Sequence, residues 1–256
     1  MEKIKLYIVS HKKCNPYIDN IREIIKVGND INFDSKIIDN TGDNISYKNS
    51  SYCELTAMYW IWKNDNYSDI LGIEHYRRQF ISSDFQLFKT KYLDEEEIKK
   101  ILTKYDAIVA KKWYTKKKNL NEAIKLSDNH KYEDFIILEN VMKKYHKDYY
   151  KIYKKIMNEE KGFNPFNMII CNKSLYNKYC KWLFQIMSEV EEKIDTSKRE
   201  GNLKRVFGYM SEILLSVWLE KNNIKYYENN VILNDSNCMK NFIRRQKCNI
   251  RNFFNK

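Results

Sequence analysis

The chain has 256 residues, 43% of them hydrophobic, with only 2 prolines and 6 glycines, which excludes collagen-like, linker-like and low-complexity classes. Its apolar runs fall well short of the roughly 20 residues that cross a bilayer, and no cleavage site follows the basic start, so we expect no membrane span, no secretion signal and a cytoplasmic location. The formal net charge of +12 indicates an anionic partner, and nucleic acid, anionic lipid and nucleotide phosphate all fit.

Short apolar segments bounded by polar residues predict strands at 5–10, 33–39, 69–74 and 106–110. Helical patterns separate them, at 16–28, 51–64 and 94–105. The first helix is predicted from Pro16 at its start and Gly28 at its end, and the second from a capping box of Ser51 and Glu54. Asp94 is the expected N-cap of the third. This alternation predicts an α/β fold with a mostly parallel central sheet.

The C-terminal half is predicted to be more helical. Helical periodicity covers 131–158, 174–194 and 203–221, a returning strand is expected at 167–171, and a last strand within 224–233. No internal repeat or linker is evident, so we expect a single domain over 1–235 followed by a basic tail at 236–256.

Two classes of site find no support in the sequence. The six cysteines form no C-x-x-C pair, which argues against a zinc site or a disulfide framework. The basic residues are not accompanied by an aromatic RNP-type strand, a GXXG loop or a paired Cys/His finger, so we expect no nucleic-acid partner.

Ligands of open α/β sheets bind at the carboxyl ends of strands, and polar residues follow three of the predicted strands. They are Ser10, His11 and Lys12; Asp39, Asn40, Thr41, Asp43 and Asn44; and His75, Tyr76, Arg77 and Arg78. The basic set after 69–74 fits a clamp for phosphate oxygens, because the guanidinium fork matches them. The alternative is a structural ion pair of these arginines with Glu74 or Asp84. The glycine-containing segment 39–46 suits hydroxyl groups of a ribose or sugar, or is an ordinary turn.

Glu212 lies in the predicted helix at 203–221. At 100° per residue, Arg205, Gly208 and Glu212 share a side opposite the main apolar face. This side is either solvated or lines a cleft, where Glu212 would act as a general base on a sugar hydroxyl. Because Gly208 costs roughly 1 kcal/mol against alanine inside a helix, we expect a close approach there.

Further along the chain, His130 and Asp134 lie four residues apart and form either an N-terminal polar turn or a substrate contact. No Asp-x-Asp pair occurs, although many nucleotide-sugar enzymes use one to hold a divalent ion. If the chain is such an enzyme, cationic side chains must replace the metal, so we predict no metal site and no cofactor.

The chain resembles domain-of-unknown-function family 4422, which is found in capsular polysaccharide and O-antigen synthesis. The resemblance runs from about residue 4 to about 230, and its motifs are "IVSHK" (8–12), "GIEHYRRQF" (72–80), "FNMIIC" (166–171), "RVFGYMSEILLSVWL" (205–219) and the longer segment 39–64. It implies a distant GT-A-like, nucleotide-sugar-binding fold and galactofuranose transfer without a bound metal.

The resemblance also implies roles for the strand-end residues. Ser10, His11, Lys12, Asp39, Asn40, Thr41, Asp43 and Asn44 would line the donor site, with His75, Tyr76, Arg77 and Arg78 on the diphosphate side. Asn167 and Glu212 would face donor sugar and acceptor, and we add His130, Asp134 and Arg205 as acceptor or sugar contacts.

The resulting hypothesis is a glycosyltransferase that moves a sugar from a UDP-sugar to a glycan or lipid-linked acceptor, with inversion, and with Glu212 as catalytic base. The alternative is a non-catalytic basic module that binds anionic glycan, lipid or nucleic acid. The tail after Met239 carries six Lys/Arg with apolar residues between them, which fits either peripheral contact with the inner face of the cell membrane or a solvated terminus. Donor sugar, acceptor and oligomeric state stay open.

Overall fold

A computed structural model describes residues 2–28, 33–82 and 90–233 of the chain; the predicted tail at 236–256 lies outside them. The main path of the central sheet runs in the order β10-β6-β9-β4-β1-β2-β3. Its strands are β1 (Ile4–Ser10), β2 (Arg22–Lys26), β3 (Ile37–Ile38), β4 (Ile70–His75), β6 (Ala107–Ala110), β9 (Ile169–Asn172) and β10 (Tyr226–Asn229). Off this path, β5 (Arg78–Phe80) pairs with β4 and with β11 (Val231–Leu233).

Most of the pairings on this path are parallel, which confirms the predicted sheet. Strands β4, β1, β2 and β3 run parallel, as do β6 and β10, whereas β9 is antiparallel to both of its neighbours. The parallel pairing of Val9 with His75 brings the carboxyl ends of β1 and β4 to the same edge of the sheet. The predicted segments at 10–12 and 75–78 are therefore neighbours.

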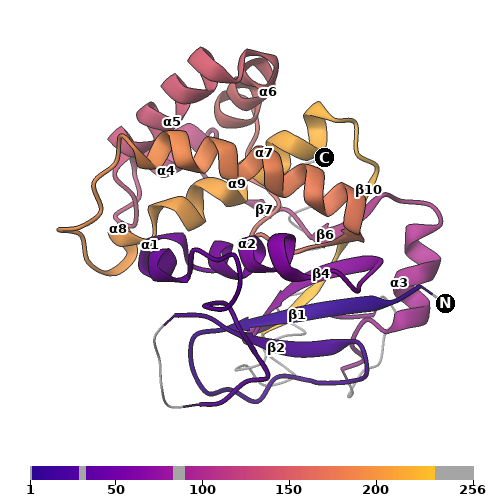
Figure 1. The fold of residues 1–256 in the computed structure, drawn as a ribbon. Coiled ribbons are helices and arrows are strands. Elements are labelled where there is room, and N and C mark those ends of the chain that lie inside the picture. Colours follow the sequence, from indigo (N-terminus) through magenta and orange to yellow (C-terminus); the bar gives the residue numbers. More distant parts are fainter. Residues whose placement is uncertain (1, 29–32, 83–89, 234–256) are drawn as a thin grey trace.

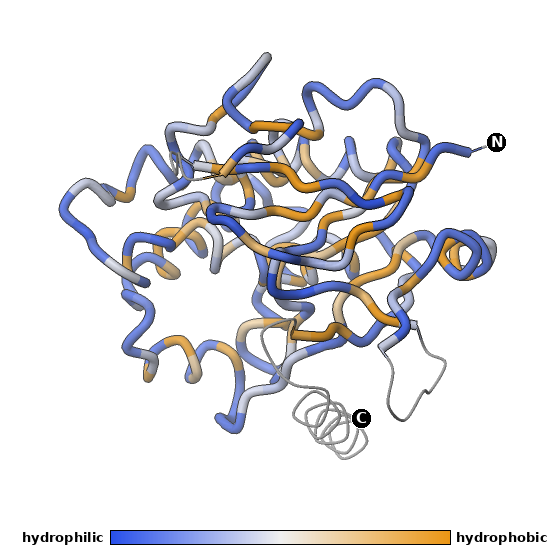
Figure 2. The backbone as a smooth tube through the Cα atoms, turned by 90° about the horizontal axis from the view of Figure 1, so that it is seen from below, coloured by the Kyte–Doolittle hydropathy of each residue, from blue (hydrophilic) through white to orange (hydrophobic). Residues whose placement is uncertain are grey.

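Helices cover both faces of the sheet. On one face α1 (Asn49–Tyr52), α2 (Leu55–Asn64), α7 (Lys173–Glu191), α8 (Gly201–Lys204) and α9 (Val206–Lys221) stack together, and α4 (Leu120–Lys125), α5 (Tyr132–Tyr145) and α6 (Lys147–Asn158) lie farther out (Figure 1). This layer contributes most of the larger apolar core. On the other face α3 (Glu95–Leu102), with the predicted N-cap Asp94, helps to enclose a smaller core. Hydrophobic residues fall along the strands, and the connecting loops are mostly hydrophilic (Figure 2).

Three predicted elements differ from the structure in part or in full. The helix expected at 16–28 is instead an extended segment followed by β2, because the edge of β1 offers this segment a parallel partner and its isoleucines fit the sheet. The helix expected at 51–64 is two helices, since Cys53 has a left-handed φ of 53° and ends α1. Glu54 makes no capping hydrogen bond, so the capping box does not form. The strand expected within 224–233 is two strands, β10 and β11.

A buried ion pair ties the sheet together beneath the predicted site. Arg22 of β2 and Glu74 of β4 are both buried, and the Arg22 Nε and Nη2 atoms donate to the Glu74 carboxylate at 2.9 and 3.2 Å. The same carboxylate accepts from the Phe80 backbone N–H of β5 at 2.9 Å. Glu74 therefore joins three strands and is fully occupied by structural contacts.

We predict that Arg22→Ala lowers the free energy of unfolding by about 3–5 kcal/mol, because it leaves a buried carboxylate without its cation. Urea unfolding followed by circular dichroism measures the change. Lys99→Ala, which breaks the exposed pair between Lys99 and Glu95 on α3, is the control and should change stability little. Equal effects of the two substitutions would contradict the structural role of Arg22.

Candidate active site

The hairpin that joins β4 to β5 carries the predicted basic residues. His75 pairs with Arg78, so Tyr76 and Arg77 form the turn between them. The Tyr76 backbone N–H donates to the Val9 carbonyl at 3.1 Å, which attaches the turn to the end of β1. The carboxyl ends of the two strands thus present one continuous surface.

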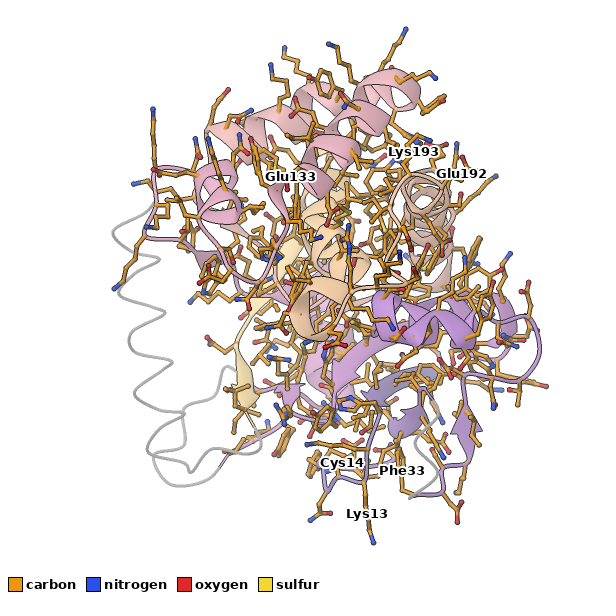
Figure 3. The ribbon with its side chains drawn as sticks, turned by 90° about the vertical axis from the view of Figure 1, so that its left-hand side faces the viewer. Lys13, Cys14, Phe33, Glu133, Glu192 and Lys193 are labelled. Carbon is orange, nitrogen blue, oxygen red and sulfur yellow. The ribbon has the colours of Figure 1, made fainter. Side chains whose placement is uncertain are left out.

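Cationic side chains gather around the Tyr76 ring. The Lys12 Nζ and the Arg77 guanidinium lie 5.4 and 5.1 Å from the ring centroid, and the His11 ring meets it edge-on at 5.3 Å. Ser10 is buried, and its Oγ donates to the Lys12 carbonyl at 2.6 Å, which shapes the turn after β1. The following Lys13 and Cys14 lie at the sheet end of the molecule, away from Glu133 and Glu192 at the helical end (Figure 3).

Arg78 lies deeper than Arg77. Its guanidinium stacks on the Phe166 ring at 4.2 Å, and its buried Nε has no hydrogen-bond partner among the described residues. Burial lowers the pKa of Arg78, while the charges of Glu212 and Glu54 act in the opposite direction. The alternative of an ion pair with Glu74 is wrong, since Arg22 holds that carboxylate; Asp84 lies outside the described residues. A buried N–H without an acceptor is a ready contact for an anionic ligand.

Two carboxylates lie close to Arg78. Burial raises the pKa of Glu212 to about 8, and the negative charge of Glu54 adds to this shift, whereas Arg78 and Arg205 oppose it. Glu54 accepts a hydrogen bond of 2.7 Å from the Asn167 amide. Near neutral pH, Glu212 therefore exchanges a proton readily, which suits a general acid or base.

The segment between β8 (Gly162–Phe163) and β9 connects these groups through an unusual backbone. Phe166 and Asn167 have successive left-handed φ angles of 74° and 53°, which side chains other than glycine seldom adopt. The Phe166 carbonyl accepts from His75 Nε2 at 2.8 Å, so this nitrogen carries a proton, and burial lowers the pKa of His75. Strain of this kind is often retained at functional sites.

Asn167 is fully buried, and its amide also donates to Ser211 Oγ at 2.9 Å. It lies behind Glu54 and orients that carboxylate. Its predicted contact with donor sugar or acceptor stays a prediction.

Helix α9 approaches the start of α2 closely, as the glycine in its sequence predicted. A Cβ at Gly208 would lie 3.3 Å from the Cβ and Sγ atoms of Cys53, which is tighter than ordinary van der Waals contact. Arg205 lies at the exposed end of the same side, and its Nε contacts Cys53 Sγ at 3.2 Å. For Gly208 and Glu212 the solvated alternative is wrong, because this side of α9 faces α2 and a pocket.

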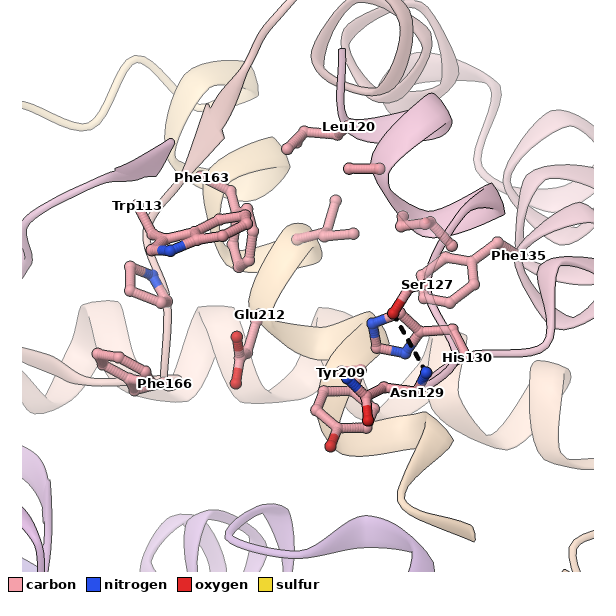
Figure 4. Close-up of a pocket in the computed structure, with 14 residues that line it drawn as sticks. Trp113, Leu120, Ser127, Asn129, His130, Phe135, Phe163, Phe166, Tyr209 and Glu212 are labelled. Carbon is pink, nitrogen blue, oxygen red and sulfur yellow. Dashed lines mark hydrogen bonds between the residues drawn. The ribbon is translucent and has the colours of Figure 1, made fainter. Parts of the chain in front are cut away.

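The pocket beside Glu212 has a volume of about 370 Å³. Its walls are mostly apolar and include five Phe, Tyr or Trp side chains, and Glu212 lies between Phe166 and Tyr209, with Trp113 on one side and Phe135 on the other (Figure 4). The strands β7 (Trp113–Tyr114) and β8 position the Trp113 side, whereas α5 carries Phe135. Phe166 contacts Arg78 and lines this pocket, so the cationic hairpin and the pocket adjoin at Phe166.

His130 and Asp134 have different partners in the structure. His130 lines the pocket and packs edge-on against Tyr209 at 4.6 Å; burial lowers its pKa. Asp134 is buried and accepts two hydrogen bonds from Arg199, at 2.6 and 2.9 Å. Asp134 thus anchors the segment around Arg199, and its role as a substrate contact stays a prediction.

The predicted donor residues at 39–44 contact α2 and their own loop. Asp39 is buried and accepts from Ser46 Oγ at 2.6 Å, whereas Asn40 is exposed. The remaining contacts are Trp60 Nε1 to the Thr41 carbonyl at 2.9 Å, Tyr59 Oη to Asp43 at 3.0 Å, and Asn44 Nδ2 to the Gly42 carbonyl at 2.9 Å. Residues 59 and 60 lie roughly 8–9 Å along α2 from Glu54, at 1.5 Å per residue. Donor binding by this loop stays a prediction.

Sequence reasoning missed several residues of this site. Glu54 was interpreted as part of a capping box, and Phe166, Tyr209 and Trp113 were not singled out. The signal that could have found Glu54 is its position inside the family-like segment 39–64, close to the buried start of a helix. The aromatic walls come from elements far apart in the sequence and carry no local signal.

Among residues 2–28, 33–82 and 90–233, no group of three or more His, Cys, Asp or Glu side chains is arranged to hold a metal ion. Within the same ranges, no helix has both the length and the apolar composition that a membrane span requires.

The fold and site together define an α/β protein with a cationic hairpin and an acidic pair at one edge of its sheet. The chain belongs to the family described as Domain of unknown function (DUF4422), whose model matches residues 5–223. Among solved structures it is similar to the apo structure of WbbM, a bifunctional glycosyltransferase, with a TM-score of 0.83 and 27% identity over 92% of this chain. The match covers 46% of the WbbM chain, so this chain spans less than half the length of that relative. A search of curated protein sequences finds no match.

We predict that Glu212→Gln raises stability increasingly as pH increases from about 4.5 to 8. The folded-state pKa of Glu212 is raised to about 8 from its ordinary value of 4.5, so the stabilising contribution of its proton is complete below 4.5 and is lost as pH rises through 8. Thermal unfolding of both proteins at pH 5 and pH 8.5 measures the change. A difference in melting temperature that is the same at both pH values would contradict the raised pKa.

Proposed function

We propose that the chain is a glycosyltransferase that transfers a sugar from a UDP-sugar to a glycan or lipid-linked acceptor in bacterial surface polysaccharide synthesis. The observation that supports it most strongly is the proximity of Arg78, whose buried Nε has no partner among the described residues, to Glu212, which has a raised pKa and lines a pocket. The family membership and the similarity to WbbM support the same class of activity.

In this proposal the hairpin side of the site receives the diphosphate. Arg78 donates to a phosphate oxygen, and Arg77 and Lys12 add positive charge around Tyr76. Such fixed cations stabilise the negative charge that develops on departing UDP. The absence of an Asp-x-Asp pair from the sequence supports charge neutralisation by side chains, and the reaction is proposed not to require a divalent ion.

The pocket side receives the acceptor. An acceptor hydroxyl oxygen attacks the anomeric carbon of the donor as its proton passes to the Glu212 carboxylate. The bond between that carbon and the β-phosphate oxygen breaks, and its electron pair leaves with UDP. A single displacement of this kind inverts the anomeric configuration. Glu54 touches neither proton nor leaving group in this scheme, and instead sets the pKa of Glu212 through its charge.

The proposal also specifies a donor sugar and a location in the cell. UDP-galactofuranose is the first donor to test, because the resemblance noted from the sequence implies it. A cytoplasmic location with peripheral contact at the membrane fits a lipid-linked acceptor. The alternative of a non-catalytic basic module gains no specific support from the site, where two acids accompany the cations.

Arg78→Ala and Glu212→Gln should each lower UDP release from the active donor at least tenfold, because the first removes charge stabilisation and the second removes the base. A screen of purified protein against UDP-sugars, scored by UDP release, first identifies that donor. Lys154→Ala, on the exposed side of α6 and far from the hairpin, is the matched control and should keep wild-type turnover. Full activity in both site variants would contradict this mechanism. Loss of activity with EDTA would show that the reaction requires a metal ion.

The pH dependence follows from the required charge state of Glu212. A general base must be ionised, so kcat/KM should rise about tenfold per pH unit below pH 8 and level off above it. Initial rates from pH 6 to 9.5 at low substrate give this profile. A profile that is flat across pH 8, or one that falls with rising pH, would show that the ionised Glu212 is not the base.

A further inference from the structure

The pocket has a polar end and an apolar end. Glu212 and Tyr209 of α9 lie at one end, and Leu120 lies at the other (Figure 4). Leu120, Ala123 and Ile124, which α4 contributes to the lining, are all apolar. A small molecule that places a reacting hydroxyl at Glu212 therefore directs its opposite side toward an aliphatic wall.

The polar groups between these two ends are partly engaged within the protein. Ser127 Oγ accepts from the Asn129 backbone N–H at 3.2 Å. The Asn129 side-chain oxygen accepts from Asn202 at 2.7 Å. A sugar hydroxyl that faced Leu120, Ala123 and Ile124 would find no hydrogen-bond partner among these three side chains, and an unpaired buried hydroxyl weakens binding.

The size of the pocket favours a short saccharide end. Its volume of about 370 Å³ is near the lower limit of small-molecule sites, which span roughly 300–1,000 Å³. Aromatic walls suit the C–H faces of a sugar ring, since such sites are mostly apolar with a few placed polar groups. Trp113 lines the pocket and is 47% exposed, so this wall reaches the surface of the protein.

The geometry points to an acceptor sugar that carries a methyl group, which packs against Leu120, Ala123 and Ile124 while a ring hydroxyl reaches Glu212. The methyl belongs either to a 6-deoxyhexose or to the acetyl group of an N-acetylated amino sugar. The orientation of the ring rests on the proposed function, because it is Glu212 that selects the reacting hydroxyl. Recognition of the methyl depends only on the pocket.

Ligand-observed NMR with the full chain tests this without a donor. Two matched pairs of free sugars separate the two sources of the methyl: D-fucose against D-galactose, and N-acetylglucosamine against N-formylglucosamine. In at least one pair the methyl-bearing sugar should bind roughly tenfold more tightly, in line with the usual worth of one methyl in an apolar pocket. Its methyl protons should receive the strongest saturation transfer. Equal affinities in both pairs would overturn the inference.

Substitutions locate the binding. Trp113→Ala should weaken the preferred sugar about tenfold, and Ala123→Ser, which adds a hydroxyl to the α4 wall, should reduce the preference for the methyl at least threefold. Tyr67→Ala is the control, because Tyr67 is 81% exposed and does not line the pocket. Unchanged binding in both pocket variants would place the sugar elsewhere and overturn the inference.

The two proposals fail in different ways. Turnover of a UDP-sugar together with equal binding of the two sugars in each pair would remove the methyl preference and leave the transferase. The expected NMR preference without turnover of any UDP-sugar would remove the transferase and leave the pocket as a site for a methyl-bearing sugar.

Discussion

The site depends on the Glu74 carboxylate, which lies near the carboxyl end of β4. It is fully buried, and it is held by Arg22 from β2 and by the Phe80 N–H from β5. Because an unpaired carboxylate at that depth would be costly, the three strands must keep their relative positions. This fixes the hairpin at 75–78, and it leaves Arg78 without a carboxylate from Glu74. Arg22 therefore stabilises this part of the sheet, whereas Arg78 is held at the site by it.

A second constraint brings the acids to the same place. The close contact between Gly208 and Cys53 holds α9 against the start of α2. Glu212 therefore lies close enough to Glu54 for the charge of Glu54 to raise its pKa. The left-handed residues Phe166 and Asn167 then connect this acidic pair to the hairpin, through His75 on one side and Glu54 on the other. The site is thus assembled from four separate segments. Its buried charges lower the stability of the fold, and the proposed reaction uses the same charges.

The sequence predicted the sheet well, because strand-length apolar runs end in polar residues at the edge where β1 and β4 meet. It failed at β2, where Pro16 and Gly28 imitate the limits of a helix while the open edge of β1 favours a strand. Local signals also misled at Glu54, which resembles a capping residue yet faces Asn167. The close approach at Gly208 was predictable, since a glycine inside an apolar helix needs a reason.

Other parts of the site could not be predicted in this way. Trp113, Phe166 and Tyr209 come together only through tertiary packing, and no local pattern distinguishes them from core aromatics. For the loop at 39–44, the sequence supplies polar groups and cannot tell whether they contact a ligand or, as with Thr41 and Asp43, the helix beside them.

The central claim is that protein nitrogen atoms at the end of β4 neutralise a diphosphate. A crystal structure of the protein soaked with UDP, without added metal, tests it most directly. The account predicts a β-phosphate oxygen within about 3 Å of Arg78 Nε, with Lys12 and Arg77 close by. A diphosphate bound elsewhere, with Arg78 Nε still unpaired, would contradict it.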